Sequence, residues 1–242
     1  MNLLIIRHGE PDYVHDDLTE AGKREAECLA ERIAPLEVRD FFVSPLGRAK
    51  ATAAPTLRKA GRTATEFDWL QEFSIPVRRP DVLERSRVPW DWLPQDWLAD
   101  PRLLRFDRWQ ENEVFQEAGV GEAYERVVRE FDALLSGYGY VREGLLYRVE
   151  KPNTDTLVFF CHLGLGCLLM SHLMNCSPMV LWQGTALPPS SVTVFHTEER
   201  RPGTAVFRAA SIGDVSHLYA AGLRPSFAAR FCEIYGNGDR VD

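Results

Sequence analysis

The chain has 242 residues, of which 45% are hydrophobic and 26% are charged, the composition of an ordinary globular protein. This length is sufficient to bury one large core, and it favours one or two domains. The formal charge of -7 and the isoelectric point of about 5.5 disfavour nucleic-acid binding through a basic surface. They are compatible with a small basic pocket that binds an anionic substrate.

Five cysteines are spread along the chain, and their spacing contains no CxxC pair. Neither a zinc ribbon nor a disulfide framework is therefore indicated. The N-terminus has no basic region and no small-residue cleavage site, and the longest apolar stretch, residues 163–174, is too short to span a bilayer. We expect a reduced, cytoplasmic protein without a membrane or nucleic-acid partner.

Strand and helix patterns alternate from the N-terminus onwards. Residues 2–6 form the continuous apolar run of a strand that is buried on both faces. Thr19 is a suitable N-cap for the helix that follows. Four residues of that helix form one apolar stripe at i, i+3, i+4 and i+7: Ala26, Leu29, Ala30 and Ile33.

The next segment repeats this alternation. Residues 40–44 predict a second strand, and an alanine-rich helix follows, which Pro55 should kink and Gly61 should end. Residues 63–67 predict a third strand. Consecutive strand–helix–strand units of this kind are right-handed and produce a parallel sheet.

Residues 74–120, hereafter the insertion, interrupt the alternation. Five prolines and four of the six tryptophans fall here without clean periodicity, the tryptophans being Trp90, Trp92, Trp97 and Trp109. Such a segment inside an α/β domain is commonly a lid or a substrate-facing subdomain. A small satellite core that uses tryptophan for bulk explains the composition equally well.

Regular patterns resume after the insertion. Helical spacing returns over residues 121–136, and residues 156–161 predict a buried strand, with a buried helix over 163–174. Ser177 and Pro178 suit the first positions of another helix.

The C-terminal part of the chain predicts two more strands. Residues 190–197 and 204–211, with a turn at residues 201–203, indicate an antiparallel hairpin at one end of the sheet. Taken together, the patterns predict a single domain over residues 1–242. Its fold is a three-layer α/β/α sandwich with a mostly parallel central sheet, and the insertion forms a helical or loop cap.

Three of the predicted strands end in groups that can bind an anion. These are Arg7-His8-Gly9, Ser44-Pro45 with Arg48 one turn into the next helix, and Cys161-His162. Ligands of an open parallel sheet bind beyond the C-terminal strand ends, so we expect these groups to converge. Arginine forks and helix N-termini match phosphate oxygens. A neutral histidine whose other nitrogen is held as a donor is a competent nucleophile toward phosphorus.

Each group taken alone has an ordinary explanation. A strand-end pair such as Arg7-His8 is usually a solvated terminus, and His162 alone would more often be a satisfied core histidine. Gly9 allows the backbone to turn back tightly, so that a carbonyl can hold one tautomer of His8. The convergence of three strand ends favours a site for a phosphoryl group.

The motifs RHGE after the first strand, LTEAG ten residues later, SPLGRAKATA and a late strand ending in histidine together resemble the histidine phosphatase superfamily, which is phosphoglycerate mutase-like. The resemblance is close over the first sixty residues, good around His162 and slight in between. It implies that His8 accepts the phosphoryl group. It implies further that Arg7, Arg48 and His162, together with Gly9, bind the phosphoryl oxygens, and that no metal or organic cofactor is required.

The family also uses a carboxylic acid after the third strand to protonate the leaving oxygen, and Glu72 stands where that acid is expected. The resemblance implies that Glu72 is first a general acid and then a general base for the water that opens the phosphohistidine. Asp68, Glu66 and Glu84 are competing candidates. The alternative for Glu72 is a solvated surface glutamate.

The chain departs from the family at several positions. Pro11 and Val14 stand where many members have threonine and asparagine, and Leu163 stands where glycine commonly follows the histidine, with Gly164 next. The mutase-type stretch ERHYG is absent after Glu72. We therefore favour a phosphatase that acts on a small phosphomonoester over a mutase.

Several alternatives stay open. A mutase-type phosphoryl transferase and a catalytically silent member that binds phosphorylated ligands are the rival functions, whereas the absence of spacing such as HxxxH disfavours a metal-dependent hydrolase. Arg78 and Arg79 suit either a second anionic subsite or a solvated loop. His217 suits either the pocket or a helix cap, and Tyr13 suits the substrate entrance. The oligomeric state is also open, a homodimer included.

Overall fold

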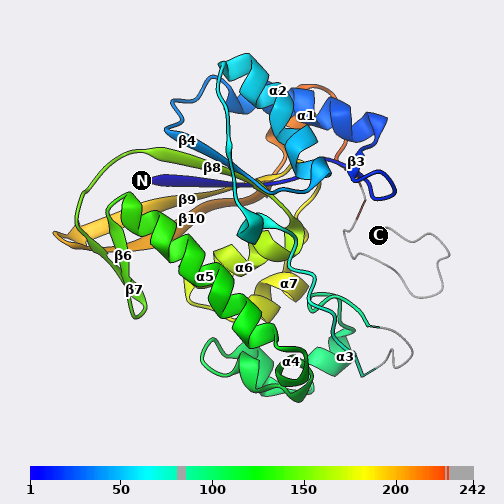
Figure 1. Cartoon of the computed structure of the whole chain (residues 1–242), viewed down its shortest axis with the longest axis vertical. Coiled ribbons are helices and arrows are strands. Elements are labelled where there is room, and N and C mark those ends of the chain that lie inside the picture. The colour runs from blue at the N-terminus through cyan, green and yellow to red at the C-terminus, as the bar shows by residue number, and fades with distance from the viewer. Residues whose placement is uncertain (81–85, 227, 229–242) are drawn as a thin grey trace.

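The computed structural model describes residues 1–80, 86–226 and 228. Its central feature is an eight-stranded sheet with helices on both faces (Figure 1). Across the sheet the strands follow the order β5 (Thr65–Glu66), β4 (Asp40–Val43), β8 (Thr156–Cys161), β1 (Asn2–Arg7), β9 (Val192–Arg201), β10 (Thr204–Asp214), β7 (Leu146–Val149) and β6 (Tyr140–Glu143). A separate short hairpin joins β2 (Pro11–Asp12) to β3 (Asp17–Leu18).

The sheet is mixed, and most of its strands point the same way. β5, β4, β8 and β1 are parallel neighbours. β9 is antiparallel to β1, and the direction then alternates through β10, β7 and β6. Only β9 and β7 therefore run against the other strands, so the expected mostly parallel sheet is confirmed.

The β9–β10 hairpin lies elsewhere in the sheet than its sequence predicted. The two strands do form an antiparallel hairpin, but β9 pairs with β1 in the interior of the sheet. Residues 140–149, for which no strand was predicted, form the β6–β7 hairpin at the edge, with a turn at Gly144, whose φ is 59°. Pairing across the sheet decides this order, and local sequence patterns carry no information about it.

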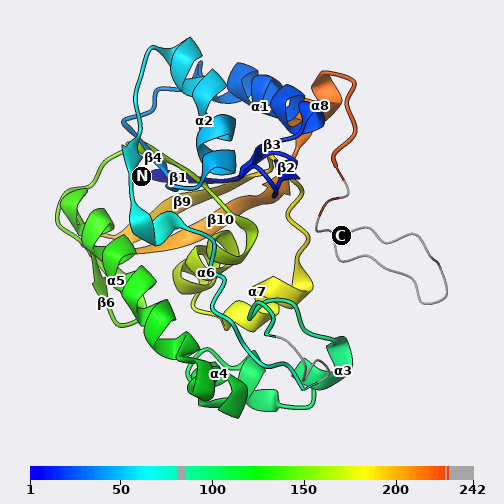
Figure 2. The same ribbon diagram turned by 45° about the vertical axis from the view of Figure 1, so that its right-hand side comes forward.

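Two helical layers complete the three-layer α/β/α arrangement that the sequence predicted. α1 and α2 cover one face of the sheet, and α5, α6 and α7 cover the other (Figures 1 and 2). The helices are α1 (Glu20–Ile33), α2 (Gly47–Ala60), α3 (Pro94–Trp97), α4 (Glu113–Ala118), α5 (Val120–Gly137), α6 (Leu163–Met174), α7 (Pro178–Gly184) and α8 (Ser216–Ala220). Short 3-10 turns lie at Asp68–Leu70, Pro101–Leu104 and Trp109–Glu111. Within the described residues no helix combines the length and the apolar content needed to cross a membrane.

β1 shows why its sequence is apolar on both faces. Successive side chains of a strand point to opposite faces of the sheet. Leu4 and Ile6 accordingly join the cluster that packs under α1 and α2, whereas Leu3 and Ile5 join the cluster on the side of α5 and α6. Both clusters are buried, which confirms the interpretation of residues 2–6 as an internal strand.

The predicted helix ends are also found. The Thr19 hydroxyl accepts a hydrogen bond from the Gly22 amide at 3.0 Å and caps α1. Gly61 ends α2 with a φ of 63°, in the left-handed region that favours glycine. Ser177 caps α7 by accepting from the Met179 amide, with proline in the first turn.

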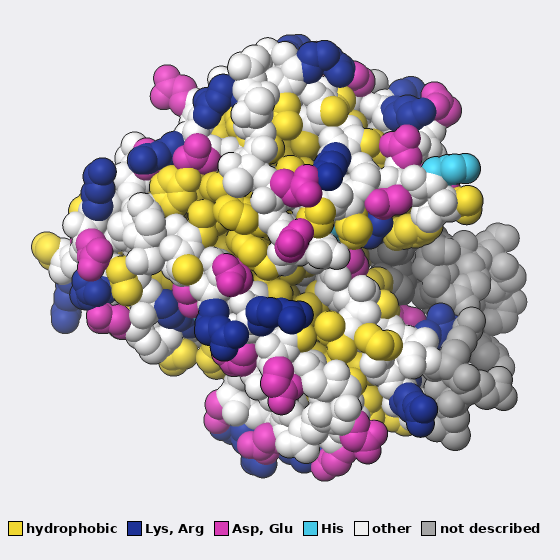
Figure 3. Space-filling model, in the orientation of Figure 1, with side chains coloured by type: hydrophobic (Ala, Val, Ile, Leu, Met, Phe, Trp, Pro, Cys, Tyr) yellow, Lys and Arg dark blue, Asp and Glu magenta, His cyan; other side chains and the backbone are white. Residues whose placement is uncertain are grey.

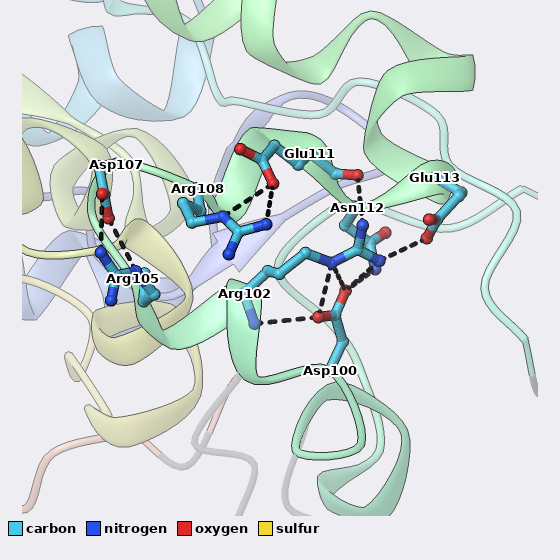
Figure 4. Close-up of polar contacts among 8 residues, drawn as sticks. All are labelled: Asp100, Arg102, Arg105, Asp107, Arg108, Glu111, Asn112 and Glu113. Atoms are coloured by element: carbon cyan, nitrogen blue, oxygen red, sulfur yellow. Dashed lines mark hydrogen bonds and ion pairs between the residues drawn. The ribbon is translucent and has the colours of Figure 1, made fainter.

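The described residues of the insertion pack into the main core, and no separate core forms among them. Trp92 and Trp109 are buried in the same cluster as α5 and α6. The Trp109 ring lies 5.0 Å from that of Tyr124 and 6.3 Å from that of Trp182, measured between ring centres. Outside this core, ion pairs join neighbouring residues of the insertion, as Figure 4 shows for Arg102 with Asp100 and Glu113, Arg105 with Asp107, and Arg108 with Glu111.

The surface carries charges of both signs. On the face shown in Figure 3, basic and acidic side chains are interspersed, and apolar side chains form a band across the centre. Neither sign dominates this face.

Candidate active site

The C-terminal ends of β1, β4 and β8 lie side by side at one edge of the sheet. The parallel register pairs Arg7 with Cys161 and Val43 with Phe160. His8 and His162, the next residues of β1 and β8, therefore emerge at the same level, and Ser44 lies one residue before that level. The sheet topology thus brings together the three strand ends that the sequence singled out.

His8 is held in one tautomer. Its Nδ1 lies 2.8 Å from the carbonyl oxygen of Gly9, and because a carbonyl only accepts, Nδ1 must carry the proton. The lone pair is then on Nε2. The side chain is buried, and burial, together with the nearby charge of Arg7 and the ring of His162, holds its pKa well below the usual 6.5. His8 is therefore a neutral imidazole with a free nucleophilic nitrogen.

His162 stands beside His8, with the two ring centres 5.2 Å apart. Its Nε2 lies 2.7 Å from the hydroxyl of Ser44, the residue that follows β4. Burial and the charges of Arg48 and Arg7 lower its pKa well below 6.5, so it too is neutral. In the tautomer in which the Ser44 hydroxyl donates to Nε2, the proton of His162 is on Nδ1.

Two arginines complete the cluster. Arg7 is buried, and its Nη1 donates to the carbonyl of Leu187. Arg48 donates from Nη1 to Asp16 Oδ1 at 2.5 Å. Three buried nitrogens of the cluster, Arg7 Nε, Arg48 Nε and His162 Nδ1, have no hydrogen-bond partner among the described residues. Buried polar nitrogens without partners are rare and costly, and the two arginine Nε–H groups are donors of the kind that bind the oxygens of an anion.

A turn at residues 187–191 is hydrogen-bonded to the end of β1, next to His8. The sequence of this turn did not predict a functional role. The Ser190 amide donates to the His8 carbonyl at 2.9 Å, and the Arg7 amide donates to the Ser191 carbonyl at 3.1 Å. Ser190 is buried and has a φ of 59°, which is uncommon for a residue other than glycine. The only sequence signal was the Pro-Pro-Ser-Ser run before β9.

Gly9 does not have the role that the resemblance implied. Its amide donates to the Thr52 hydroxyl at 2.9 Å, and its carbonyl accepts from His8. Both polar groups of Gly9 are therefore engaged inside the protein. Gly9 orients His8 and does not offer its amide to a phosphate.

The LTEAG motif shapes the loop that leaves His8. Thr19 donates from its hydroxyl to the Glu10 side chain at 2.7 Å and from its amide to the Glu10 carbonyl at 3.0 Å. A Cβ on Gly22 would lie 2.2 Å from the Glu10 carbonyl oxygen, so only glycine permits this close approach of two backbones.

Asp16 contacts a residue of the candidate site, Arg48, and the sequence patterns did not single it out. Its carboxylate accepts from the Gly47 amide at 2.6 Å and from Arg48 at 2.5 Å, so it ties the start of α2 to the loop after His8. Burial opposes its ionisation, but these hydrogen bonds outweigh burial and lower its pKa. Asp16 lies 32 residues before Arg48 in the chain, and no local pattern links the two.

Glu72 lies next to the His162 turn. Its Oε1 accepts from the amides of Phe73 at 2.8 Å and Leu165 at 3.0 Å. Burial raises its pKa above the usual 4.5, and these amides, a hydrogen bond from the Gly164 amide and the charge of Arg7 oppose the rise. Because Oε1 accepts from amides, the proton of the acid form belongs on Oε2.

The competing carboxylates are placed differently. Glu66 is exposed and pairs with Lys50 at 2.6 Å, and Asp68 is exposed in the turn that follows. Neither makes a hydrogen bond to the cluster around His8 among the contacts of the described residues. Glu84 lies outside the described residues.

The other predicted candidates fall around the site or away from it. Tyr13 is 66% exposed, and the Arg48 guanidinium lies 5.5 Å from its ring centre, so this tyrosine lies beside the site at the surface. Arg79 is buried against Asp91 at 2.9 Å, and Arg78 is exposed. His217 is buried next to Ser190, with Nε2 3.3 Å from the hydroxyl.

A surface cavity of about 680 Å³ adjoins the acid side of the site. It lies between residues 68–76 and α5, and Glu72 is the one predicted site residue that lines it. Within the described part of the chain, no group of three or more histidine, cysteine, aspartate or glutamate side chains is arranged to hold a metal ion.

Comparison with protein families identifies one match. Residues 3–209 match the histidine phosphatase superfamily (branch 1). A curated relative, a probable phosphatase from the fission yeast Schizosaccharomyces pombe, is 35% identical over 66 residues, which cover 24% of this chain. The chain spans only 32% of the length of that relative.

Solved structures show the same fold at low sequence identity. A phosphoserine phosphatase mutant from Entamoeba histolytica in complex with phosphoserine matches with a TM-score of 0.58 at 17% identity, over 90% of this chain and 98% of that one. A putative alpha-ribazole-5'-P phosphatase from Escherichia coli matches with a TM-score of 0.57 at 18% identity, over 89% and 98%. A mycobacterial glucosyl-3-phosphoglycerate phosphatase matches with a TM-score of 0.57 at 16% identity, over 88% and 98%.

Proposed function

The chain belongs to the histidine phosphatase superfamily (branch 1), and on this basis we propose that it hydrolyses a small phosphomonoester through a phosphohistidine on His8. One observation carries the proposal. Arg7, His162 and Arg48 all lie close enough to His8 to lower its pKa, and each has a buried nitrogen with no partner among the described residues, while the lone pair of His8 is on Nε2. A phosphoryl group bound there satisfies all three donors and presents its phosphorus to the nucleophile.

The first step is phosphoryl transfer to the enzyme. His8 Nε2 attacks phosphorus, the bond to the ester oxygen breaks, and Glu72 gives that oxygen its proton, so the alcohol leaves neutral. Arg7 and Arg48 stabilise the negative charge on the other oxygens. The raised pKa of Glu72, which burial causes, supports this role because it keeps the acid protonated at higher pH.

The second step returns the enzyme to its starting state. Glu72, now a carboxylate, takes a proton from a water molecule as that water attacks the phosphohistidine. The nitrogen–phosphorus bond breaks, inorganic phosphate leaves, and His8 regains its lone pair on Nε2.

The relatives support phosphatase over mutase chemistry, since the curated relative is described as a probable phosphatase and two structural neighbours are described as phosphatases for phosphoserine and glucosyl-3-phosphoglycerate. The four described cysteines, Cys28, Cys161, Cys167 and Cys176, are free thiols, which supports a reducing compartment such as the cytoplasm.

The proposal is tested with 4-nitrophenyl phosphate in the presence of EDTA. We expect turnover by the wild type, an acid-labile phosphoenzyme, and a loss of at least about a thousandfold in His8→Ala. His196→Ala is the matched control, because this exposed histidine bonds to Asn2 at 2.7 Å at the start of β1, away from the strand ends. Equal turnover in His8→Ala and His196→Ala would contradict the mechanism. Transfer of phosphate to a second acceptor with little free phosphate released would indicate a mutase.

A further inference from the structure

Trp90 of the insertion reaches the turn that contains the acid. Its indole Nε1 donates to the carbonyl of Phe73 at 2.9 Å. The Phe73 amide in turn donates to Glu72 Oε1 at 2.8 Å. One peptide residue thus separates the indole from the carboxyl group. The backbone of Trp90 is held from α7, because Gln183 donates to its carbonyl at 3.0 Å.

Gly164 shows how closely the indole and the carboxyl group lie. A Cβ built on this glycine would be 2.3 Å from Trp90 Nε1 and 2.8 Å from Glu72 Oε1. Both groups therefore contact the same face of Gly164, in the first turn of α6 after His162. A residue with a side chain cannot occupy this position without displacing one of them, which explains why glycine stands here even though Leu163 follows the histidine.

A second tryptophan, Trp182, supports the turn at Gly164 and Phe73 from the core. Trp182 donates from its indole to the Gly164 carbonyl at 2.9 Å and stacks on Phe73, with ring centres 5.7 Å apart. Trp90 is half-buried and packs against the main core. The Glu72 carboxyl group thus lies against a turn that one tryptophan supports from the core and another from the insertion.

We infer that Trp90 is a positioning residue for the general acid: it holds Glu72 in place through the Phe73 peptide and shields one side of its carboxyl group from water, while the other side faces the cavity. This inference rests on the proposed function, in which Glu72 protonates the leaving oxygen. It gives the insertion a part in the reaction, since the insertion supplies a wall of the acid site. Protonation of the leaving oxygen matters most when the leaving alcohol is a weak acid, so the effect of Trp90 depends on the leaving group.

The test compares two substrates and two tryptophans. Turnover of 4-nitrophenyl phosphate, whose leaving group needs little protonation, is measured beside that of phenyl phosphate, whose leaving group needs more. In Trp90→Phe we expect kcat for phenyl phosphate to fall at least about tenfold further than kcat for 4-nitrophenyl phosphate. Trp97→Phe, a half-buried tryptophan of the same insertion, is the control and leaves the ratio unchanged.

The pH profile gives a second readout that a merely structural role does not move. Water admitted by Trp90→Phe stabilises the ionised carboxylate, so the basic limb of kcat/KM moves to lower pH. Gly164→Ala attacks the same contact with Trp90 intact and is expected to change the substrate ratio in the same direction. Equal losses on both substrates with an unmoved basic limb in both variants would overturn the inference.

The proposed function fails separately from this inference. If Glu72→Gln lowers kcat equally for both substrates, Glu72 is not the general acid, and the positioning role of Trp90 is then also wrong. If Glu72→Gln discriminates between the substrates and Trp90→Phe does not, only the positioning role is wrong.

Discussion

Acid should destabilise this protein partly through one buried histidine, His217. Its Nδ1 lies 3.4 Å from Arg32 Nη1, and because a guanidinium only donates, Nδ1 must be an acceptor. Protonation would place a second positive charge against Arg32. Burial and this charge lower the pKa of His217 from 6.5 to about 4, whereas the nearby Asp214, paired with Arg32 at 2.6 Å, acts in the opposite direction.

The sign of the effect follows from proton counting. Between pH 6.5 and about 4 the unfolded chain binds a proton at this histidine and the folded protein does not. The contribution of His217 to the free energy of unfolding is therefore fully present above pH 6.5, and it is lost as the pH drops towards 4. The difference between the two pKa values sets an upper limit of about 3.4 kcal/mol, and because solvent screens part of the repulsion we expect about 2 kcal/mol.

The matched variant is His217→Gln, whose amide can still accept from Arg32 and donate to Ser190 but does not titrate. Urea unfolding followed by tryptophan fluorescence is measured at pH 7, 6, 5 and 4 for both proteins. His8 and His162, whose pKa values are also lowered, contribute equally to both and cancel in the difference. We expect the wild type to lose about 2 kcal/mol more than His217→Gln over this range. Parallel losses, or a pKa above 6 for His217 by NMR, would refute the reasoning.

Three further predictions follow from packing and from the site. Asp16→Asn removes the charge that holds Arg48, so KM for an aryl phosphate should rise about tenfold with less change in kcat. Steady-state kinetics measure both constants. A lower KM would mean that Asp16 competes with phosphate for Arg48. Gly22→Ala forces the two backbone segments at Gly22 and Glu10 apart and should lower the free energy of unfolding by about 1–3 kcal/mol. Thermal unfolding measures the loss, and Gly137→Ala, where a Cβ would have nothing within 4 Å, is the control. Trp109→Ala leaves a cavity at a fully buried position and should lower the free energy of unfolding by about 3–5 kcal/mol. The control Leu104→Ala, at a side chain that is 46% exposed, should change it by less than about 0.5 kcal/mol. Similar losses in both variants would contradict the burial of Trp109.

Local patterns in the sequence were sufficient for most of the helices and strands. β1 is apolar on both faces because both faces are buried, α1 begins at the cap Thr19, and α2 ends at Gly61. These signals depend on a few neighbouring residues, so they can be read without knowing the fold. The meeting of Arg7, His8, Arg48 and His162 could also be predicted, because parallel strands deliver their ends to one edge of a sheet.

Only the tertiary structure decided the contacts between segments that are distant in the chain. The tether from Asp16 to Arg48, the clamp of Ser190 on His8 and the indole of Trp90 beside Gly164 each join different elements. The same holds for the sheet order, in which β9 lies inside and the β6–β7 hairpin forms the edge. Such contacts are selected by the packing of the whole chain, and a hydrogen bond between distant residues leaves no periodic trace in the sequence. The sequence therefore indicated that Arg7, His8, Arg48 and His162 meet, whereas the groups that hold them in position could be identified only from the fold.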